Sequence, residues 1–362
     1  MKDNYRKTWI EVDLTALYKN YQIAQKAIGD KKIIPVVKAN AYGHGMIEVM
    51  RFLVEKGVSI CAVSLLEEAV SLREHFKDIK ILILGVVSED DFDVVSNHKL
   101  DMTINNLATL KAVLKYDQKL NCHLKVDTGM ARYGILDPKE VVKAVNKLQK
   151  HPTVKLEGIY THLAIVDENE AYADRQLEKM RKIIQSLTVK PPMIHISNSS
   201  ATFMHEHKLD FTTHVRLGIS LYGLSLNPYT PILYPVMKLK TTIVQIRLLK
   251  PGDCVGYGAN YCPIKPENIG VLPLGYADGF LRRNKDGKVE INGKIYQLVG
   301  RICMEACFVK LDDEVKVGDS VTVFGGLIEI DEIARHNQTI NYEIVTTMSS
   351  RIQRRYFRGE TK

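Results

Sequence analysis

The sequence predicts an α/β protein, a (β/α)8 barrel followed by a mainly-β domain, and three observations support this. Between about residues 33 and 223, short apolar runs alternate with amphipathic helical stretches. The apolar runs number eight, which is the strand count of a TIM barrel. Near Pro228–Pro235 the helical periodicity stops, and the sequence that follows is strand-like and rich in turns. A chain of 362 residues is long enough for both parts.

The predicted barrel strands are short, and several are apolar on both faces, as parallel strands covered by helices must be. In chain order they are Ile33–Val37, Ser59–Val63, Ile79–Leu84, Leu100–Ile104, Cys122–Val126, Leu156–His162, Met193–Ile196 and Val215–Tyr222. The helical patterns between them include Ile47–Lys56, Leu66–His75, Leu107–Leu114, Glu140–Lys150 and Ala171–Leu187. We therefore assign residues 13–232 to the barrel and expect the active site at the C-terminal ends of its strands.

The second domain is predicted at residues 233–362. Strands are expected at Thr241–Leu248, Ile269–Leu272, Lys288–Ile291 and Val321–Phe324, with Asn292-Gly293 as a hairpin turn and a short helix near Asp331–His336. The opening segment Tyr5–Val12 alternates like a strand. We expect residues 1–12 to pair with the C-terminal domain rather than to begin the barrel.

The composition argues against nucleic-acid and membrane partners. The formal charge of +8 is spread along the chain, and its densest patch, residues 351–355, has no accompanying stacking or groove-entering motif. Such a charge suits anionic small molecules equally well. The N-terminus has no apolar signal-peptide core, and no stretch approaches membrane-spanning length. We expect a soluble cytoplasmic protein.

The six cysteines contain no CxxC pair, and no histidine lies at a zinc-finger spacing from Cys303 and Cys307. We therefore expect no metal site, and we interpret the cysteines as reduced and buried, as in a cytosolic protein.

Lys38 is the most informative single residue. It ends an apolar, β-branched strand and leads into a polar turn with glycines at 43 and 45. Burying an ammonium group costs several kcal/mol unless something compensates. Burial also lowers the pKa of a lysine, and a neutral amine is a nucleophile that can condense with an aldehyde. The alternative is that Lys38 only marks the end of the strand and extends into water.

Polar residues gather at the ends of the later barrel strands, where they would share one rim. They are Lys125–Arg132 after the fifth strand, Tyr160–His162 after the sixth, Ser197–Ser200 after the seventh, and Arg216–Ser220 in the eighth strand and its exit. Barrels commonly bind a phosphate after the seventh and eighth strands, and Asn198, Ser199, Gly218 and Ile219 suit this role. The phenol of Tyr42 could reach the same anion. A nucleophilic lysine beside a phosphate site is what pyridoxal 5'-phosphate requires.

These motifs resemble a known family. VVKANAYGHG around Lys38 looks like the cofactor-lysine signature of alanine racemases, and KVDTGMARYG, YTHLA, SNSS, VRLGISLYG, VGYGANY, PLGYADG and GRICME follow in the family's order and spacing. The resemblance covers essentially the whole chain. It implies a barrel plus β-domain, pyridoxal phosphate as cofactor, interconversion of L- and D-alanine for peptidoglycan, and a head-to-tail homodimer with shared active sites.

The resemblance also implies roles for single residues. Racemisation needs acid/base groups on both faces of the α-carbon, and the family pattern assigns them to Lys38 and to Tyr257 of the partner subunit. An ordinary phenol is a weak base at neutral pH, and His162 and Arg216 would form a hydrogen-bonded chain that activates it. Arg216 would also face the pyridine nitrogen of the cofactor.

Further roles concern the substrate. Arg132 would orient the substrate carboxylate, and Tyr276 and Met304 would come from the second subunit. Lys125 matches a lysine that is carbamylated in some members. An unmodified lysine beside Arg132 would form a like-charge pair, which favours carbamylation or a bound anion.

Two departures from the family pattern leave the substrate open. Glu305 stands where many members have aspartate, and Ser350 stands where some members have a tyrosine near the phosphate. Serine or a broader set of small amino acids is therefore an alternative to alanine. A non-enzymatic barrel that carries the cofactor would lack the β-domain. A related decarboxylase would pair the ring nitrogen with a carboxylate instead of an arginine.

Overall fold

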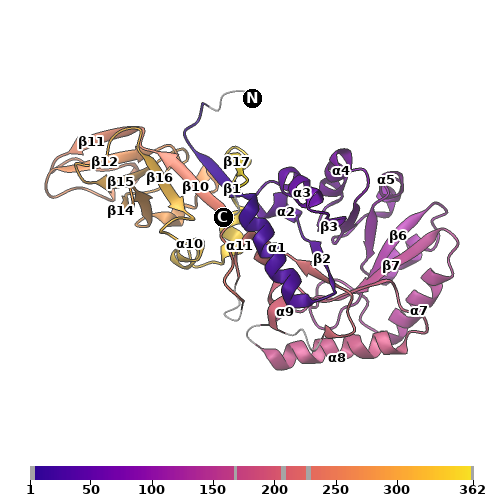
Figure 1. The fold of residues 1–362 in the computed structure, drawn as a ribbon. Coiled ribbons are helices and arrows are strands. Elements are labelled where there is room, and N and C mark those ends of the chain that lie inside the picture. Colours follow the sequence, from indigo (N-terminus) through magenta and orange to yellow (C-terminus); the bar gives the residue numbers. More distant parts are fainter. Residues whose placement is uncertain (1–4, 167–168, 205–208, 226–229, 360–362) are drawn as a thin grey trace. The chain divides into compact units, whose positions relative to one another are not determined.

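The computed structural model describes residues 5–166, 169–204, 209–225 and 230–359 (Figure 1). The chain folds as two compact units. The β-rich unit consists of Met1–Leu17, Tyr42–Gly45 and Tyr234–Lys362, and the barrel unit consists of Tyr18–Ala41 and Met46–Leu233. Within the described residues, no helix is both long enough and apolar enough to cross a lipid bilayer.

The barrel unit contains an eight-stranded parallel sheet in the order β2-β9-β8-β7-β6-β5-β4-β3. A parallel bridge between Val36 and Ala62 joins the two ends of this order, so the sheet closes. The strands are β2 (Lys32–Pro35), β3 (Ile60–Val63), β4 (Lys80–Ile83), β5 (Asp101–Ile104), β6 (Leu120–Lys125), β7 (Val154–Tyr160), β8 (Met193–His195) and β9 (His214–Leu217). The predicted fold class is therefore confirmed.

The helices of the barrel follow from apolar residues spaced to share one face. In α7 the buried residues are Val141, Ala144, Val145 and Leu148, and the Asp137 carboxylate caps the helix by accepting from the Lys139 amide at 2.8 Å. The helices are α1 (Leu14–Ile28), α3 (Met46–Glu55), α4 (Leu66–His75), α5 (Phe92–Asn97), α6 (Leu107–Val113), α7 (Pro138–Gln149), α8 (Glu170–Ser186) and α9 (Ser199–Met204). The segment labelled α2 (Lys38–Tyr42) is a left-handed turn and not a regular helix.

The predicted eighth strand is too long. β9 ends at Leu217, and residues Ile219–Tyr222 form a 3-10 helix, η3, after Gly218. All four residues of η3 are buried. A short apolar run buried on every side has the same sequence pattern whether it is a strand or a helical turn, which is why the prediction failed here.

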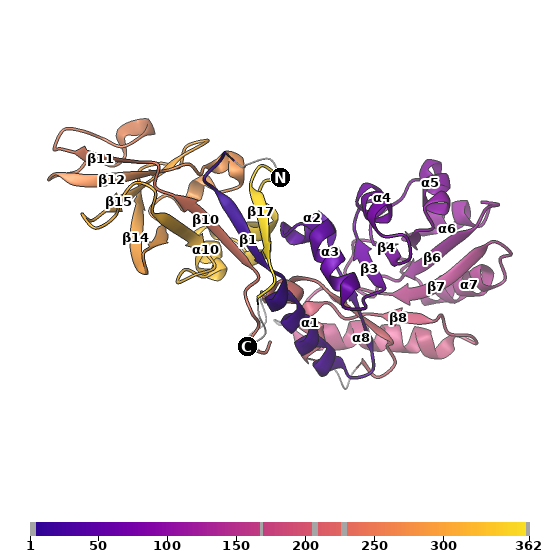
Figure 2. The same ribbon diagram turned by 45° about the horizontal axis from the view of Figure 1, so that its top comes forward.

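The β-rich unit contains a nine-stranded sheet in the order β11-β12-β15-β14-β13-β16-β10-β1-β17. Its strands are β1 (Trp9–Asp13), β10 (Met237–Thr242), β11 (Gln245–Leu249), β12 (Glu267–Leu272), β13 (Lys288–Ile291), β14 (Lys294–Val299), β15 (Cys307–Leu311), β16 (Ser320–Phe324) and β17 (Gln353–Phe357). β1 pairs antiparallel with β10 and parallel with β17, and Figure 2 shows the three strands side by side. Two short helices, α10 (Ile330–His336) and α11 (Asn341–Thr346), complete the unit.

Asn292 and Gly293 connect β13 to β14 as a two-residue hairpin, with φ of 50° and 76°. The predicted strand Thr241–Leu248 is wrong, because it consists of two strands that separate at Ile243 and Val244. The amide of Ile243 donates to Asp319 and that of Val244 donates to Val271, so the chain changes hydrogen-bonding partners between the two residues.

Candidate active site

Lys38 begins a left-handed turn. Ala39, Asn40, Ala41 and Tyr42 all have φ between 51° and 54°, a conformation that L-residues other than glycine seldom adopt in succession. The turn is held from outside, because the Ala39 amide donates to the Glu68 carboxylate at 2.6 Å and the Asn40 side chain accepts from the Met46 amide at 2.9 Å.

Strain of this kind is typical of functional sites. The same Glu68 carboxylate accepts from the amides of Ser64 and Leu65 at the start of α4. Sequence reasoning missed Glu68, because glutamate in the first turn of a helix is an ordinary capping residue.

The lysine itself is half-buried at the end of the segment that follows β2. Burial lowers its pKa, with Arg132 and Arg216 acting in the same direction and Glu68 opposing them. The amine is therefore easier to deprotonate than that of an exposed lysine, as a nucleophilic role requires.

Lys125 and Arg216 are buried cations on the ring of Tyr160. The Lys125 Nζ lies 4.9 Å and the Arg216 Cζ 5.1 Å from the ring centroid. Burial, followed by Arg216 and Arg132, lowers the pKa of Lys125 to about 7. This amine therefore loses its proton far more readily than that of an exposed lysine.

Arg216 is fixed by acceptors on both of its terminal nitrogens. One donates to His195 Nδ1 at 2.9 Å and to the His195 carbonyl at 2.8 Å. The other donates to the Thr161 and Ile196 carbonyls at 2.8 and 2.9 Å and to His162 Nδ1 at 3.1 Å. Burial lowers the pKa of Arg216 to about 10, so the guanidinium still carries its charge at neutral pH.

His162 and His195 are consequently neutral. Burial and then Arg216 lower the pKa of both imidazoles well below the usual range. A guanidinium can only donate, so Nδ1 of each ring accepts and the proton resides on Nε2. From His195, Nε2 can then donate to His123 Nδ1 at 2.9 Å, deeper in the barrel. Sequence reasoning did not identify His195 or His123, which lie within apolar strand patterns.

The segments after β8 and β9 meet through Ser199. Its Oγ accepts from the amides of Gly218 at 3.0 Å and Ser220 at 3.3 Å, and the Asn198 side chain accepts from the Ala201 amide. The structure thus brings the predicted residues Asn198, Ser199, Gly218 and Ile219 into adjoining segments at this end of the barrel.

Arg132 lies in a loop organised by Asp127, whose carboxylate accepts from the amides of Gly129, Met130 and Ala131 at 2.8 to 3.2 Å. Arg132 is exposed. Its charge nevertheless contributes to the lowered pKa of Lys38, Lys125 and His162, which places it among them.

These features fit pyridoxal phosphate. Lys38, Lys125, Arg132 and Arg216 concentrate positive charge that an anionic group would balance. The hydroxyls of Ser197 and Ser220 are buried and have no hydrogen-bond partner among the described residues. A phosphate or phenolate oxygen is a suitable partner for such donors.

The remaining predicted residues lie in the β-rich unit. Tyr42 is buried, with its ring edge-on to that of Tyr342 at 6.1 Å, and burial raises its pKa. Its predicted contact with a phosphate stays a prediction. Tyr276 and Met304 are brought together by two backbone hydrogen bonds, from Tyr276 N to Cys303 O and from Ala277 N to Met304 O, each 3.1 Å.

Charged side chains support the Met304 segment. The Arg351 guanidinium donates to both oxygens of Glu305 at 2.8 and 3.0 Å. Arg6 donates to both oxygens of the buried Asp278 at 2.5 Å and lies 3.8 Å from Glu305.

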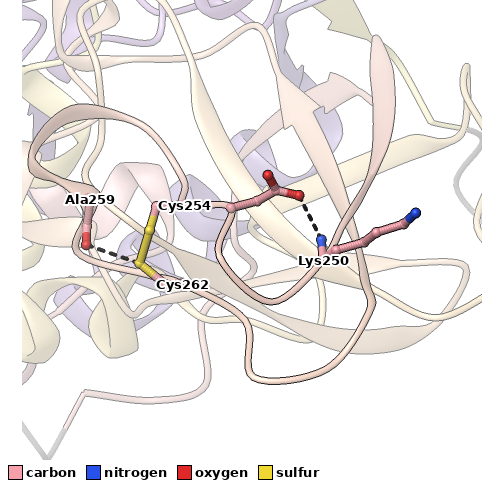
Figure 3. Close-up of a disulfide and its surroundings, with 5 residues drawn as sticks. Lys250, Cys254, Ala259 and Cys262 are labelled. Carbon is pink, nitrogen blue, oxygen red and sulfur yellow. Dashed lines mark hydrogen bonds between the residues drawn. A yellow bond between two sulfur atoms is a disulfide. The ribbon is translucent and has the colours of Figure 1, made fainter.

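Tyr257 is the first residue of η4 (Tyr257–Ala259), and 71% of its surface is exposed. A disulfide between Cys254 and Cys262 brackets its loop (Figure 3). The prediction of reduced, buried cysteines is wrong for these two, which are exposed. It holds for Cys61, Cys122 and Cys307. The missed signal is the position of the pair on either side of a glycine-containing turn, which brings the two residues together.

Comparisons with known proteins identify the family of this chain. Residues 12–226 match the family model described as "Alanine racemase, N-terminal domain", and residues 236–356 match "Alanine racemase, C-terminal domain". An alanine racemase of Geobacillus stearothermophilus is 39% identical over 372 residues, covering 99% of this chain and 95% of the relative.

Solved structures agree as well. Alanine racemase from E. faecalis has a TM-score of 0.92 at 34% identity, covering 98% of this chain and 99% of the other. A histidine racemase from Leuconostoc mesenteroides has a TM-score of 0.91 at 26% identity, covering 98% and 99%. With both domains matched and close similarity along nearly the whole length, the chain belongs to the alanine racemase family.

Proposed function

We propose that this chain interconverts L- and D-alanine with pyridoxal 5'-phosphate, and that it supplies D-alanine for peptidoglycan in the cytoplasm. The observation that carries the proposal is the half-buried amine of Lys38, with its lowered pKa, in a barrel mouth lined by further cations. When bound, the cofactor would acidify the α-proton of an amino acid by withdrawing electrons from the α-carbon.

Each residue then has a role that its surroundings support. Lys38 would hold the cofactor through its amine and would move a proton at one face of the α-carbon. Ser199, Gly218 and Ile219, with Asn198 and Tyr42, bind the phosphate. Arg132 orients the substrate carboxylate.

With the cofactor bound, Arg216 would donate a hydrogen bond to the pyridine nitrogen, and a guanidinium cannot accept a proton from it. The nitrogen would then stay unprotonated, which would limit electron withdrawal and with it side reactions such as transamination.

The second acid/base group is Tyr257 of the partner subunit in a head-to-tail homodimer. Its exposed position on a loop supports a role outside its own unit. Tyr276 and Met304 accompany it, the latter through its backbone amide to the substrate carboxylate. His162 connects Arg216 to Tyr257 as a hydrogen-bonded chain.

Lys125 is proposed to carry a carbamate. Only a neutral amine reacts with carbon dioxide, and the pKa of about 7 supports this reactivity. The resulting anion would pair with Arg132 in place of a repulsive pair of cations.

Attachment of the cofactor can be tested directly. Protein incubated with pyridoxal phosphate should absorb in the visible range, and borohydride should fix the cofactor on the peptide that contains Lys38. The Lys38→Ala variant should lose both the fixed cofactor and racemisation. Full racemase activity in this variant would refute the mechanism.

Serine is the second candidate substrate. Glu305 is turned to Arg351 by two hydrogen bonds, so its longer side chain is anchored beside the Met304 segment, and Ser350 adjoins Arg351. Comparing kcat/KM for alanine, serine, lysine and histidine decides the question. A preference for alanine supports the lead proposal, and a higher value for serine replaces it.

A further inference from the structure

The disulfide closes the base of the loop that presents Tyr257. The disulfide joins Cys254 to Cys262 (Figure 3). Their Cα atoms are 4.2 Å apart at a sequence separation of eight, and both residues are exposed. Between them, Val255 is buried against Ile269 and Val299, whereas residues 256–260 are all exposed. The tyrosine therefore lies at the tip of a solvent-facing loop with a covalent clasp at its base.

The backbone of this loop is left-handed at three residues, a conformation that glycine adopts more easily than other residues. Gly256, Gly258 and Ala259 have φ of 61°, 77° and 46°. One backbone hydrogen bond spans the loop, from Val255 N to Tyr261 O at 2.8 Å. Two glycines beside Tyr257 leave it more freedom than other residues would.

Side chains add limited support at the tip. A Cβ at Gly258 would lie 2.9 Å from Arg301, and one at Gly256 would lie 2.9 Å from Phe308, so the loop passes close over both side chains. With its amide nitrogen donating to Gly258 O, the Asn260 side chain accepts from Arg301 Nε at 2.9 Å. These contacts hold the tip from one side, and the disulfide holds its two ends.

We propose that Cys254 and Cys262 are positioning residues for Tyr257, and that their disulfide makes the racemase redox-sensitive. This inference rests on the proposed function, in which Tyr257 is an acid/base group. A proton transfer is sensitive to displacements of about 1 Å, so loosening the ends of the loop should slow the steps that use Tyr257.

The switch is an ordinary thiol–disulfide exchange. A thiolate of a dithiol reductant attacks one cysteine sulfur, the S–S bond breaks, and a mixed disulfide forms. The second thiol of the reductant then attacks the reductant's own sulfur in the mixed disulfide and releases the cysteine that was bound there. Two electrons reach the protein, Cys254 and Cys262 leave as thiols, and the reductant leaves as its own disulfide. Exposed disulfides are the ones most open to this reaction.

The experiment compares the cofactor-loaded enzyme before and after reduction. Under denaturing conditions, the oxidised form should show four thiols and the reduced form six. Reduction with dithiothreitol should lower kcat for alanine by about three- to tenfold, with cofactor absorbance unchanged. Reoxidation with glutathione disulfide should restore kcat.

Isotope effects separate positioning of Tyr257 from general loosening of the protein. Reduction should raise the deuterium isotope effect for the α-deuterated enantiomer whose proton Tyr257 removes. The effect for the other enantiomer should not rise. Equal increases for both enantiomers would count against positioning of Tyr257.

Variants supply the controls. The double variant Cys254→Ser/Cys262→Ser should have the kcat of the reduced enzyme, and dithiothreitol should not change it. Cys303→Ser removes a different thiol of the same unit and should keep the full response to reduction. If the double variant does not fold, the reduced wild-type enzyme still carries the comparison.

Two outcomes separate the acid/base role of Tyr257 from the positioning role of the disulfide. A Tyr257→Phe variant that racemises as fast as wild type overturns the proposed role of Tyr257. If Tyr257→Phe is inactive but oxidised and reduced wild type have equal kcat, the positioning inference alone is overturned. Six free thiols after treatment with glutathione disulfide would also overturn it.

Discussion

At the scale of single residues, the barrel mouth consists of cations that lower one another's proton affinity. Arg216 is the centre of this arrangement, because it donates to His162 and His195, and its charge adds to their burial in lowering the pKa of both imidazoles. A neutral imidazole with its Nδ1 occupied can use only Nε2 toward other groups, and this gives the hydrogen-bonded chain a direction.

Lys125 gives this electrostatic account a test by pH. Because its pKa is about 7 in the folded protein and near 10.4 in an unfolded chain, the unfolded state holds more protons between these values. The unfolding free energy should therefore rise with pH across that window. In urea unfolding at pH 7 and pH 9, in buffer free of carbon dioxide, wild type should gain more stability than Lys125→Met.

The matched control is Lys139→Met, an exposed lysine, which should keep the wild-type dependence on pH. If the unfolding free energies of wild type and Lys125→Met change equally between the two pH values, the pKa of Lys125 is not lowered in the folded protein.

At the scale of elements, the left-handed turn at Lys38–Tyr42 is the least ordinary part of the barrel. Each L-residue in that conformation costs roughly 1–2 kcal/mol, and glycine avoids the cost. The turn persists because the Glu68 carboxylate accepts from the Ala39 amide and the Asn40 side chain accepts from the Met46 amide. The strained backbone lowers the stability of this segment, and it sets the path of the chain after Lys38.

Ala39→Gly tests this strain. Ala39 is exposed, so the substitution loses little packing. The unfolding free energy should rise by about 1 kcal/mol, because relief of strain exceeds the added freedom of the unfolded chain. Ala27→Gly, in the right-handed helix α1, should instead lower the unfolding free energy. If both variants are destabilised alike in chemical denaturation, the turn is not strained.

Element patterns explain which parts of the fold were predictable. The apolar run of β3 is buried on both faces, and Asn292-Gly293 has the turn chemistry of a hairpin, so local sequence determined them. The break between β10 and β11 and the 3-10 helix η3 depend on tertiary partners. The contact of Glu68 with the Ala39 amide likewise joins residues that no local pattern relates, whereas the disulfide joins two cysteines on either side of a glycine-containing turn.

At the scale of the whole molecule, the predicted site residues are divided between two units. Lys38, Arg132 and Arg216 belong to the barrel unit, whereas Tyr257 and Met304 belong to the β-rich unit. The sequence motifs predict site residues in both units. The head-to-tail dimer that would join them remains a proposal, because no local sequence pattern specifies how two copies of a chain are arranged.

Mixing two inactive variants tests the shared site. In a head-to-tail homodimer, Lys38→Ala and Tyr257→Phe subunits form mixed dimers in which one of the two sites is intact. Dissociating and reassociating an equal mixture should restore about a quarter of wild-type activity, since half of the dimers are mixed. Each variant treated alone is the control. Recovery of no activity in mixed dimers shown to form would contradict the shared site.

The central claim is that Lys38 and Tyr257 act on opposite faces of the α-carbon, and proton exchange in D2O measures this most directly. Tyr257→Phe should exchange the α-proton of one alanine enantiomer with retained configuration, while racemisation falls by about 10²-fold or more. The other enantiomer should exchange far more slowly. Exchange of both enantiomers at equal rates, accompanied by racemisation at the wild-type rate, would contradict the two-base account.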